Sequence, residues 1–391
     1  MGWGEAGASD SGTMGLERAL VAIDLPGGPA FCDAVRWAWD AGAAVLPLHP
    51  GLPEAWKHDL LVSLAPSFVM EAPGRLWSLA GGRPVEEGDA LVIPTSGSSG
   101  TPKGVVLTHA ALDAAADASN ARLGTDAGVT WLACLPLHHI GGFSVLTRAW
   151  RTGAGLVVHD RFDAAAVEAA ADAGATHTSL VPTALGRIDA ARFERILLGG
   201  SAIPADRPAN TVATYGMTES GAGVVYDGIP LDGVVVRIDP ADGVIELRSP
   251  TLLRCYRDDH DPKDAGGWYR TGDVGRFDPD DGDRLVVEGR ADDLIITGAE
   301  KVWPAVVEDR LRTHPGVADV AVLGEPDPEW GQRVTAIVVP ADPAAPPALD
   351  ELRDHVRAVL PVAAAPKELR LVERLPRTAL GKLRRSELGR S

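Results

Sequence analysis

A glycine- and hydroxyl-rich segment between two strand-like runs is the first feature of the sequence that could do chemistry. It reads PTSGSSGTPKG, residues 94–104, and eight of its eleven residues are Ser, Thr or Gly. Residues with so little side-chain bulk let many backbone N–H groups and hydroxyls approach one ligand, and Lys103 adds a positive charge, so a polyphosphate suits the segment. A flexible linker is the alternative, but the runs 90–93 and 105–109 predict order on both sides.

Other motif-like patterns exclude common alternatives. The segment fails the Walker A pattern because Lys103 precedes a Gly instead of following one, and the pair Gly381-Lys382 is followed by Leu where that pattern needs Ser or Thr. No GxSxG elbow occurs, which leaves a Ser-His-Asp hydrolase unsupported. The adjacent His138 and His139 diverge and lack further ligands, so a packed or capping pair is favoured over a metal site.

Charge and composition narrow the range of partners. The 37 basic and 54 acidic side chains give a net charge of -17, which argues against a nucleic-acid groove or an anionic membrane surface. The first residues lack the basic and apolar parts of a secretion signal, and no apolar run reaches about eighteen residues. We therefore expect a cytoplasmic enzyme without nucleic-acid or membrane partners, and 391 residues predict two or three domains.

The order of strand-like and helix-like segments predicts the elements that must position these residues. Up to about residue 225, apolar runs such as 89–94 and 195–200 alternate with Ala-rich helical stretches, which predicts an α/β domain with a largely parallel sheet. From about 225 to 289, short strands between Asp-Gly turns predict an antiparallel β-rich subdomain. The rest predicts a small α+β domain, so the expected domains are 1–289 and 290–391.

Six motifs in one order carry a resemblance to a known family. They are TSGSSGTPKGVVLTH, LPLHHIGG, YGMTES, YRTGDVGRFD, GRADDLIITGAEKVWP and PRTALGKLRR, spread over residues 95–385. The chain resembles the adenylate-forming acyl-CoA synthetase superfamily, which includes acyl-CoA ligases, the adenylation domains of peptide synthetases and firefly luciferase. The resemblance implies a large N-terminal domain and a small mobile lid. It also implies that a carboxylate attacks the α-phosphate of ATP to give acyl-AMP and pyrophosphate, after which the thiol of coenzyme A displaces AMP.

The resemblance assigns roles to the opening segment and to two later motifs. Glu219 in YGMTES matches a carboxylate that holds Mg²⁺, and Thr218 a hydroxyl near the α-phosphate, with a helix cap as the structural alternative. The β- and γ-phosphates are expected to be held by Thr95, Ser96, Ser98, Ser99, Thr101 and Lys103. The adenine pocket is expected to be formed by Tyr215, Gly199, Gly200 and Ser201.

Further matches lie nearer the C-terminus. Asp273 in RTGD matches an acid that pairs with both ribose hydroxyls, and Arg290 a cation on the ribose or phosphate side, with surface turn charges as the alternative. Lys382 matches the lysine that bridges carboxylate and α-phosphate during adenylation, against the alternative of a solvated basic tail. Asp292 matches the hinge of the lid. Gly298 is expected to let the pantetheine chain pass close to backbone, although Ala299 and Trp303 depart from the commoner SGGENIYP.

Fewer residues of the sequence indicate which acid is the substrate. His139 matches a His beside the acyl pocket that orients the substrate or gates the thiol. The chain is short for the superfamily, so we expect a reduced N-terminal subdomain with GAAVLPLHPGLP as its remnant. Its compactness, SLVPTAL and LLGGSAIP are most similar to the 2-succinylbenzoate:CoA ligases of menaquinone biosynthesis. Arg148 and Arg187 are candidate cations for a second carboxylate. Room for an aromatic ring is expected at Ser201, Ala202, Gly221 and Gly223.

The expected ligands are therefore ATP, Mg²⁺, coenzyme A and a small carboxylic acid. Three alternatives stay open at this point: another aryl- or acyl-CoA ligase, a stand-alone adenylation enzyme that loads a carrier protein, and a non-catalytic sensor of nucleotide or acyl ligand. The presence of Lys103, Glu219, Asp273 and Lys382 argues against the sensor, because binding alone does not need Lys382. Nothing in the sequence predicts the oligomeric state.

Overall fold

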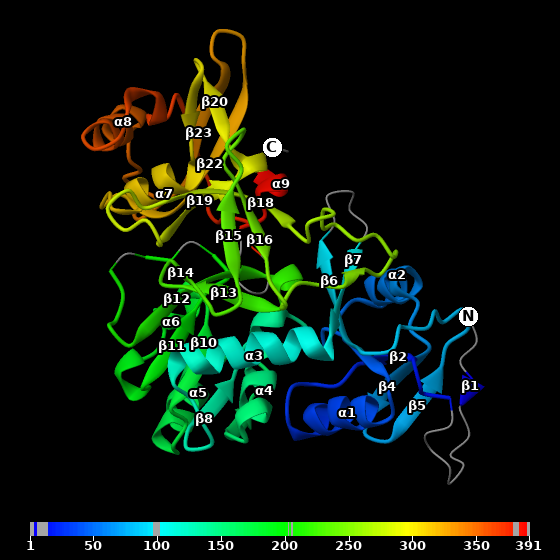
Figure 1. Ribbon diagram of the computed structural model, residues 1–391. Coiled ribbons are helices and arrows are strands. Elements are labelled where there is room, and N and C mark those ends of the chain that lie inside the picture. The colour runs from blue at the N-terminus through cyan, green and yellow to red at the C-terminus, as the bar shows by residue number, and fades with distance from the viewer. Residues whose placement is uncertain are drawn as a thin grey trace. The chain divides into compact units, whose positions relative to one another are not determined.

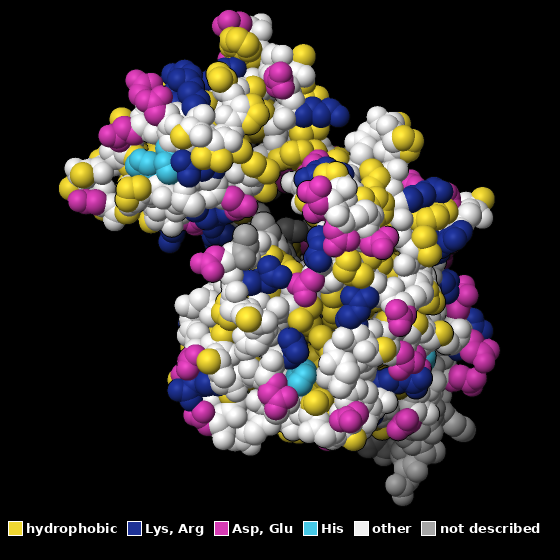
Figure 2. All heavy atoms as spheres, turned by 60° about the vertical axis from the view of Figure 1, so that its left-hand side comes forward, with side chains coloured by type: hydrophobic (Ala, Val, Ile, Leu, Met, Phe, Trp, Pro, Cys, Tyr) yellow, Lys and Arg dark blue, Asp and Glu magenta, His cyan; other side chains and the backbone are white. Residues whose placement is uncertain are grey.

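The computed structural model describes residues 4–5, 15–96, 102–201, 203–204, 206–377 and 383–388. The chain divides into two compact units (Figure 1). Unit 1 runs to Val235 and includes Leu247–Tyr269, whereas unit 2 consists of Val236–Glu246 and the residues from Arg270 onward. Acidic and basic side chains are interspersed over the face shown in Figure 2. Among the described residues, no helix combines the length and apolar character needed to cross a membrane.

An eight-stranded sheet in unit 1 ends in the predicted phosphate segment. Its strand order is β1-β5-β4-β2-β3-β6-β7-β17, and β4, β2, β3 and β6 pair in parallel. The four residues of β2 and of β3 are all buried, as expected for parallel strands covered on both faces. Leu60 and Leu64 of α2 pack into their core. The bounds are β1 Gly4–Glu5, β2 Leu20–Ile23, α1 Pro29–Asp40, β3 Ala44–Pro47, α2 Glu54–Leu64, β4 Phe68–Ala72, β5 Arg75–Ser78, β6 Asp89–Ser96, β7 Pro102–Thr108 and β17 Cys255–Tyr256.

A seven-stranded sheet in unit 1 carries most of the remaining predicted site. Its order is β14-β13-β12-β11-β10-β8-β9, with parallel pairing from β9 to β12. Two of its helices begin at side-chain caps, since Thr108 accepts from the Ala111 N–H and Asp163 from the Ala166 N–H. The bounds are α3 His109–Leu123, β8 Thr130–Ala133, α4 Ile140–Thr152, β9 Gly155–Val158, α5 Ala164–Asp172, β10 His177–Leu180, α6 Pro182–Leu185, β11 Arg195–Leu198, β12 Thr211–Met217, β13 Ala222–Tyr226 and β14 Ile229–Pro230.

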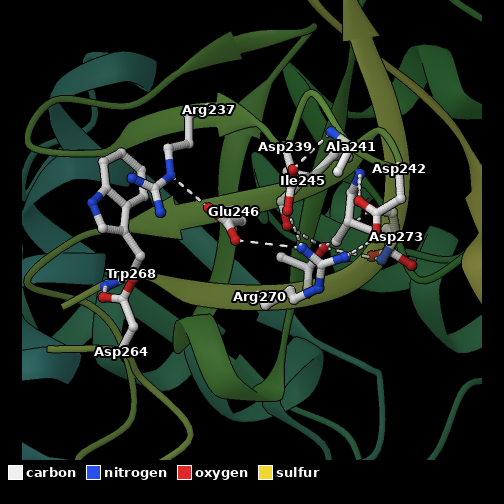
Figure 3. A network of polar contacts seen from close by, with 12 residues as sticks. Arg237, Asp239, Ala241, Asp242, Ile245, Glu246, Asp264, Trp268, Arg270 and Asp273 are labelled. Atoms are coloured by element: carbon white, nitrogen blue, oxygen red, sulfur yellow. Dashed lines mark hydrogen bonds and ion pairs between the residues drawn. The ribbon is translucent and has the colours of Figure 1, made fainter. Parts of the chain in front are cut away.

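The β-rich region is a four-stranded sheet with the order β15-β16-β18-β19. Figure 3 shows Arg270 of β18 reaching the turn between β15 and β16. Its Nη1 lies 2.7 Å from Asp239 Oδ2 and 3.5 Å from Glu246 Oε1, and its Nη2 pairs with Asp242. These exposed charges add little stability, but they tie β18 to the turn. The bounds are β15 Val235–Ile238, β16 Val244–Arg248, β18 Tyr269–Phe277 and β19 Leu285–Arg290.

The C-terminal part of unit 2 is a small sheet with the order β21-β20-β23-β22 and with β24 beside β23. Alternate residues of β22 and β23 enter two different cores, as a strand's period of two requires. Val320, Val322 and Val338 pack with α7 and α8, whereas Ala321 and Ile337 pack with the C-terminal tail. The bounds are β20 Ile295–Thr297, β21 Glu300–Val302, α7 Pro304–Arg312, β22 Val317–Asp327, β23 Gly331–Pro340, α8 Leu349–Arg357, β24 Glu368–Leu371 and α9 Arg385–Leu388.

This architecture confirms the predicted fold class, an α/β region followed by a β-rich sheet and a small α+β part. Residues 15–88 supply four strands and two helices, β2 to β5 with α1 and α2, and the expected reduction of this region relative to the superfamily stays a prediction. The compact units divide the chain at residues 235, 246 and 269. The predicted boundary between 289 and 290, which concerns a moving lid, stays a prediction.

Candidate active site

The predicted phosphate segment closes a β-hairpin. Strands β6 and β7 pair antiparallel, with Thr95 opposite Lys103 and Ser96 opposite Pro102 at the end of the ladder. Thr95 Oγ1 donates to the Lys103 carbonyl oxygen over 3.3 Å, and the Lys103 side chain is exposed. The structure therefore brings three predicted phosphate ligands to the end of one hairpin. The other three, Ser98, Ser99 and Thr101, lie outside the described residues.

The turn that carries Thr218 and Glu219 is held by its own buried side chain. It is a single 3₁₀ turn, Thr218–Ser220, between the antiparallel strands β12 and β13. The Ser220 hydroxyl accepts from the Met217 N–H over 2.9 Å and donates to the Ala222 carbonyl over 2.7 Å. The cap position of the turn is Met217, so the helix-cap alternative for the Thr-Glu pair is wrong. Both side chains are instead half-buried on a fixed turn.

Tyr256 joins two predicted site residues, and sequence reasoning missed it. Its hydroxyl donates to Glu219 Oε1 over 3.1 Å, and Lys103 Nζ lies 5.1 Å from the centroid of its ring. Burial, followed by the charge of Glu219, raises the pKa of Tyr256 to about 12, so the phenol keeps its proton and donates it. The only signal was an apolar run ending in Tyr, directly before an acidic loop.

The Glu219 carboxylate suits a hard divalent cation such as Mg²⁺. Within the part of the chain that the structure describes, Glu219 Oε2 has no hydrogen-bond or ion-pair partner. An open carboxylate oxygen on a fixed turn suits Mg²⁺, which takes few protein ligands and completes its shell with water and phosphate oxygens. The described residues contain no group of three or more His, Cys, Asp or Glu that could hold a metal by themselves.

The residues expected around adenine lie at the carboxyl ends of two neighbouring strands of the seven-stranded sheet. Strands β11 and β12 are parallel, with Leu198 opposite Ala213, so Gly199 to Ser201 directly after β11 and Tyr215 near the end of β12 lie toward the same edge of the sheet. The Gly199 N–H donates to the Leu180 carbonyl over 3.1 Å. A Cβ on Gly199 would lie 2.5 Å from Thr214 Oγ1, so glycine is required there by packing alone.

Asp273 and Arg290 form an ion pair in unit 2. They lie opposite each other on β18 and β19, with Arg290 Nη1 3.2 Å from Asp273 Oδ1. Thr271 Oγ1 accepts from the Asp273 N–H over 3.0 Å, and Gly272 supplies a φ of 76°. Burial lowers and the Asp273 charge raises the pKa of Arg290, with a net rise that keeps the Arg290 guanidinium charged. The Asp273 side chain is only 13% exposed, unlike that of a surface turn charge.

His139 belongs to a cluster of three imidazoles in unit 1. The ring of His138 lies 4.6 Å from that of His49 and 4.3 Å from that of His139. Burial and the neighbouring rings lower the pKa of His138 to about 3, and burial and His49 lower the pKa of His139 to about 4. His139 is therefore neutral near pH 7 and offers a hydrogen bond, not a positive charge. It begins α4 without a side-chain cap, so the capping alternative is wrong and the packed one holds.

The two arginines considered for a second carboxylate have other neighbours. Arg148 is 4% exposed, its Nε donates to Ser119 Oγ over 2.8 Å, and its guanidinium lies 5.6 Å from the Trp131 ring centroid. It thus joins α4 to α3. Arg187 is exposed and lies 5.1 Å from the ring centroid of Phe162. The role of either arginine toward a second carboxylate stays a prediction. Among the described residues, Arg148 Nη1 is buried and has no hydrogen-bond partner.

The predicted coenzyme A contact lies in a two-residue hairpin turn. Gly298 and Ala299, at φ of 59° and 67°, join β20 to β21, with Thr297 opposite Glu300. A Cβ on Gly298 would lie 2.8 Å from the Trp330 ring, so this glycine has a packing reason beside the predicted one. Lys367 Nζ lies 3.7 Å from the Trp330 centroid. Asp292, the predicted hinge, is exposed in a short turn at 291–293.

Ala299→Gly is expected to stabilise unit 2, because Ala pays a steric cost in the left-handed region that Gly does not. The gain should be about 1 kcal/mol in the free energy of unfolding. Urea unfolding followed by circular dichroism measures it. Ala305→Gly in helix α7 is the matched control and should lower the stability by a similar amount, since Gly disfavours helix. Equal losses in both variants would contradict the assigned backbone conformation.

Lys382 lies outside the described residues, but both flanks of its segment are anchored in unit 2. Arg377 and Leu383 form an antiparallel bridge, and Arg377 Nη2 lies 2.8 and 2.7 Å from the two carboxylate oxygens of Asp319. On the other side, Arg385 pairs with the buried Glu308 over 2.8 Å. Arg377 and Arg385 are therefore both paired, while the role of Lys382 itself stays a prediction.

Comparison with known proteins gives the same family in two parts of the chain. The family described as AMP-binding enzyme matches residues 78–245, and the family described as AMP-binding enzyme C-terminal domain matches residues 306–382. The probable 2-succinylbenzoate–CoA ligase of Mycobacterium tuberculosis (strain ATCC 25618 / H37Rv) is 41% identical over 340 residues, covering 81% of this chain and 88% of the relative. The 2-succinylbenzoate–CoA ligase of Bacillus licheniformis is 35% identical over 337 residues, covering 76% and 69%.

Solved structures agree with these relatives. The o-succinylbenzoate CoA synthetase (MenE) of Bacillus subtilis, in complex with the acyl-adenylate intermediate OSB-AMP, superposes with a TM-score of 0.83 at 26% identity, covering 96% of this chain and 89% of that chain. ATP-bound MatB from Rhodopseudomonas palustris has the same fold, with a TM-score of 0.82 at 21% identity over 95% and 88%. The family predicted from the six motifs is thereby confirmed: the chain belongs to the AMP-binding enzymes of the adenylate-forming acyl-CoA synthetase superfamily and is an AMP-forming acid–thiol ligase.

Proposed function

We propose that this chain converts 2-succinylbenzoate to 2-succinylbenzoyl-CoA in menaquinone biosynthesis, by way of the acyl-adenylate, with ATP and coenzyme A as co-substrates. The observation that carries the proposal is the 41% identity over 88% of a probable 2-succinylbenzoate–CoA ligase. The grouping of Lys103, Tyr256 and Glu219 supports it, since it joins a cation and a carboxylate beside the phosphate hairpin. A cytoplasmic location goes with this proposal, because both co-substrates are cytoplasmic metabolites.

The proposed nucleotide ligands follow the motifs that carry them. Thr95, Ser96 and Lys103, with Ser98, Ser99 and Thr101, bind the leaving pyrophosphate, and Asp273 binds the ribose hydroxyls beside Arg290. Gly199, Gly200, Ser201 and Tyr215 bind adenine. Because adenylation needs alignment and charge neutralisation more than covalent help, fixed donors and cations account for the chemistry.

Glu219 is proposed to hold Mg²⁺, which neutralises phosphate charge when bound. Thr218, on the same turn, offers a hydroxyl to the α-phosphate. Lys382 bridges the acid and the α-phosphate, and Asp292 is the hinge that alternates the lid between adenylation and thioester formation. Gly298 then lies beside the incoming thiol. His139 contributes a neutral imidazole to the acyl side, because its lowered pKa keeps it uncharged.

The test is mass spectrometry of the purified protein with Mg-ATP, coenzyme A and a panel of 2-succinylbenzoate, benzoate, salicylate and medium-chain fatty acids. We expect 2-succinylbenzoyl-CoA and AMP. Lys382→Ala should slow acyl-adenylate formation at least about a hundredfold, because it removes a cation aimed at the developing charge, and should leave thioester formation from supplied acyl-adenylate nearly unchanged. Lys301→Ala, at an exposed lysine of the same unit, is the control.

Other results would redirect the proposal. Accumulation of acyl-AMP without thioester would favour the enzyme that loads a carrier protein. Thioester formed from a different acid in the panel would favour another aryl- or acyl-CoA ligase. If no acid gave either product, the nucleotide or acyl sensor would take the place of the ligase.

A further inference from the structure

A short segment around Tyr256 is attached to both halves of the proposed metal and phosphate site. On one side, the Leu253 N–H donates to the Glu219 carbonyl over 2.8 Å. On the other side, the Arg254 N–H donates to the Val106 carbonyl over 2.9 Å, and the Arg257 N–H to the Gly104 carbonyl over 2.7 Å. Residues 253–257 therefore lie between the Glu219 turn and strand β7, directly beyond Lys103.

Two arginine side chains fix this segment in place. Arg254 makes a two-pronged ion pair with Asp89, over 2.8 and 2.9 Å, and Asp89 is 3% exposed. Arg257 is 5% exposed and donates to the carbonyls of Leu64 and Pro84 over 3.0 and 2.8 Å. A buried arginine with several partners, such as Arg257, and a two-pronged pair with a buried carboxylate, such as Arg254 with Asp89, are costly to displace. The backbone on both sides of Tyr256 is thus anchored to the eight-stranded sheet.

Tyr256, held between these two anchored residues, contacts the proposed site. It is 9% exposed, its hydroxyl donates to Glu219 Oε1 over 3.1 Å, and its ring faces Lys103 Nζ at 5.1 Å. The hydroxyl also hydrogen-bonds to Tyr269, which is 7% exposed. The Tyr256 O–H donates a hydrogen bond to Glu219 and its oxygen accepts one from Tyr269, so the phenol is engaged both as donor and as acceptor. Because Tyr256 holds Glu219 by Oε1, the second oxygen, Oε2, is the one left to contact a cation.

We propose that Tyr256 is a positioning residue for adenylation: its hydroxyl orients the Glu219 carboxylate toward the divalent cation, and its ring holds the Lys103 ammonium beside the phosphate hairpin. This inference rests on the proposed function, because it assumes that Glu219 binds the cation of Mg-ATP. Groups that orient a metal ligand typically change metal affinity or activity about ten- to a hundredfold when removed. Tyr269 supports Tyr256 in the same chain of hydrogen bonds.

The test compares Tyr256→Phe with Tyr226→Phe in the whole protein. Tyr226 is the matched control, since it is 1% exposed and its hydroxyl also makes one close hydrogen bond, 2.8 Å to Ser119. The measurement is pyrophosphate release at fixed ATP and increasing Mg²⁺. For Tyr256→Phe we expect the half-saturating Mg²⁺ concentration to rise at least about tenfold, and for Tyr226→Phe no change. Thioester formation from supplied acyl-adenylate, which uses no Mg-ATP, should be unchanged in both.

A second comparison separates orientation of Glu219 from mere packing. If Tyr256 acts through Glu219, adding Tyr256→Phe to Glu219→Gln should cost nothing further, whereas independent effects would multiply. Tyr256→Leu, which also removes the ring, should raise the KM for ATP beyond that of Tyr256→Phe. Equal Mg²⁺ dependence in Tyr256→Phe and Tyr226→Phe would overturn the inference while leaving the ligase intact. If the wild-type protein itself released no pyrophosphate, the proposed function would be contradicted instead.

Discussion

Gly216→Ala is expected to abolish measurable acyl-adenylate formation, although it adds a single methyl group. A Cβ on Gly216 would lie 2.0 Å from the Ala222 carbonyl oxygen and 2.6 Å from the Gly223 Cα, and neither is the end of a flexible side chain. Strands β12 and β13 must therefore separate, which moves the turn that holds Thr218 and Glu219. We expect a loss of about 3 kcal/mol in stability and at least about a hundredfold in adenylation rate.

The two effects are measured by urea unfolding and by pyrophosphate release. Gly186→Ala is the control in the same unit, because its nearest neighbour to an added Cβ is 4.0 Å away and its φ is negative. That variant should keep wild-type stability and activity. A Gly216→Ala protein with wild-type activity would mean that the pairing of β12 and β13 does not position Glu219.

The second large effect is expected for Glu219→Gln. The amide keeps the size and one oxygen of the side chain but removes the negative charge that attracts a divalent cation. Adenylation should fall at least about a hundredfold at fixed Mg²⁺, with part of the loss recovered at high Mg²⁺. Thioester formation from supplied acyl-adenylate should change little, because that half-reaction does not use the Mg-pyrophosphate group.

Glu87→Gln provides the matched control, since Glu87 is an exposed glutamate of the same unit. Its Mg²⁺ dependence should equal that of the wild-type protein. If Glu219→Gln also showed the wild-type Mg²⁺ dependence, Glu219 would be a hydrogen-bond partner of Tyr256 and nothing more, and the cation would have to bind elsewhere.

Many residues of the candidate site could be proposed from the sequence because they lie in short local motifs. The hairpin at Thr95 and Lys103, the turn at Glu219 and the bend at Asp273 each consist of consecutive residues whose small size or positive φ defines the shape. The roles proposed for them come from the family resemblance that the six motifs carry. The α/β class was likewise predictable, since β11 and α5 alternate in a pattern of apolar strands and Ala-rich helices.

The missed features depend on contacts between distant segments. Tyr256 meets Glu219 across 37 residues of sequence, and nothing local distinguishes it from other tyrosines that end an apolar run. Arg148 was considered by charge alone, and its contact with Ser119, which joins α4 to α3, lies 29 residues away in sequence and could not be predicted locally. Apart from β3, which lies in the apolar run GAAVLPL, the strands within residues 15–88 are four or five residues long, too short for periodicity to separate them from buried helix.

The two cores of the C-terminal sheet have a consequence for modularity. Every residue of both clusters lies between Ile295 and Leu388, on elements from β20 to α9. The buried side chains of these two clusters are thus encoded by one continuous stretch. Such continuity is the organisation expected of a part that folds as its own unit, and the turn at Gly298 lies within that stretch.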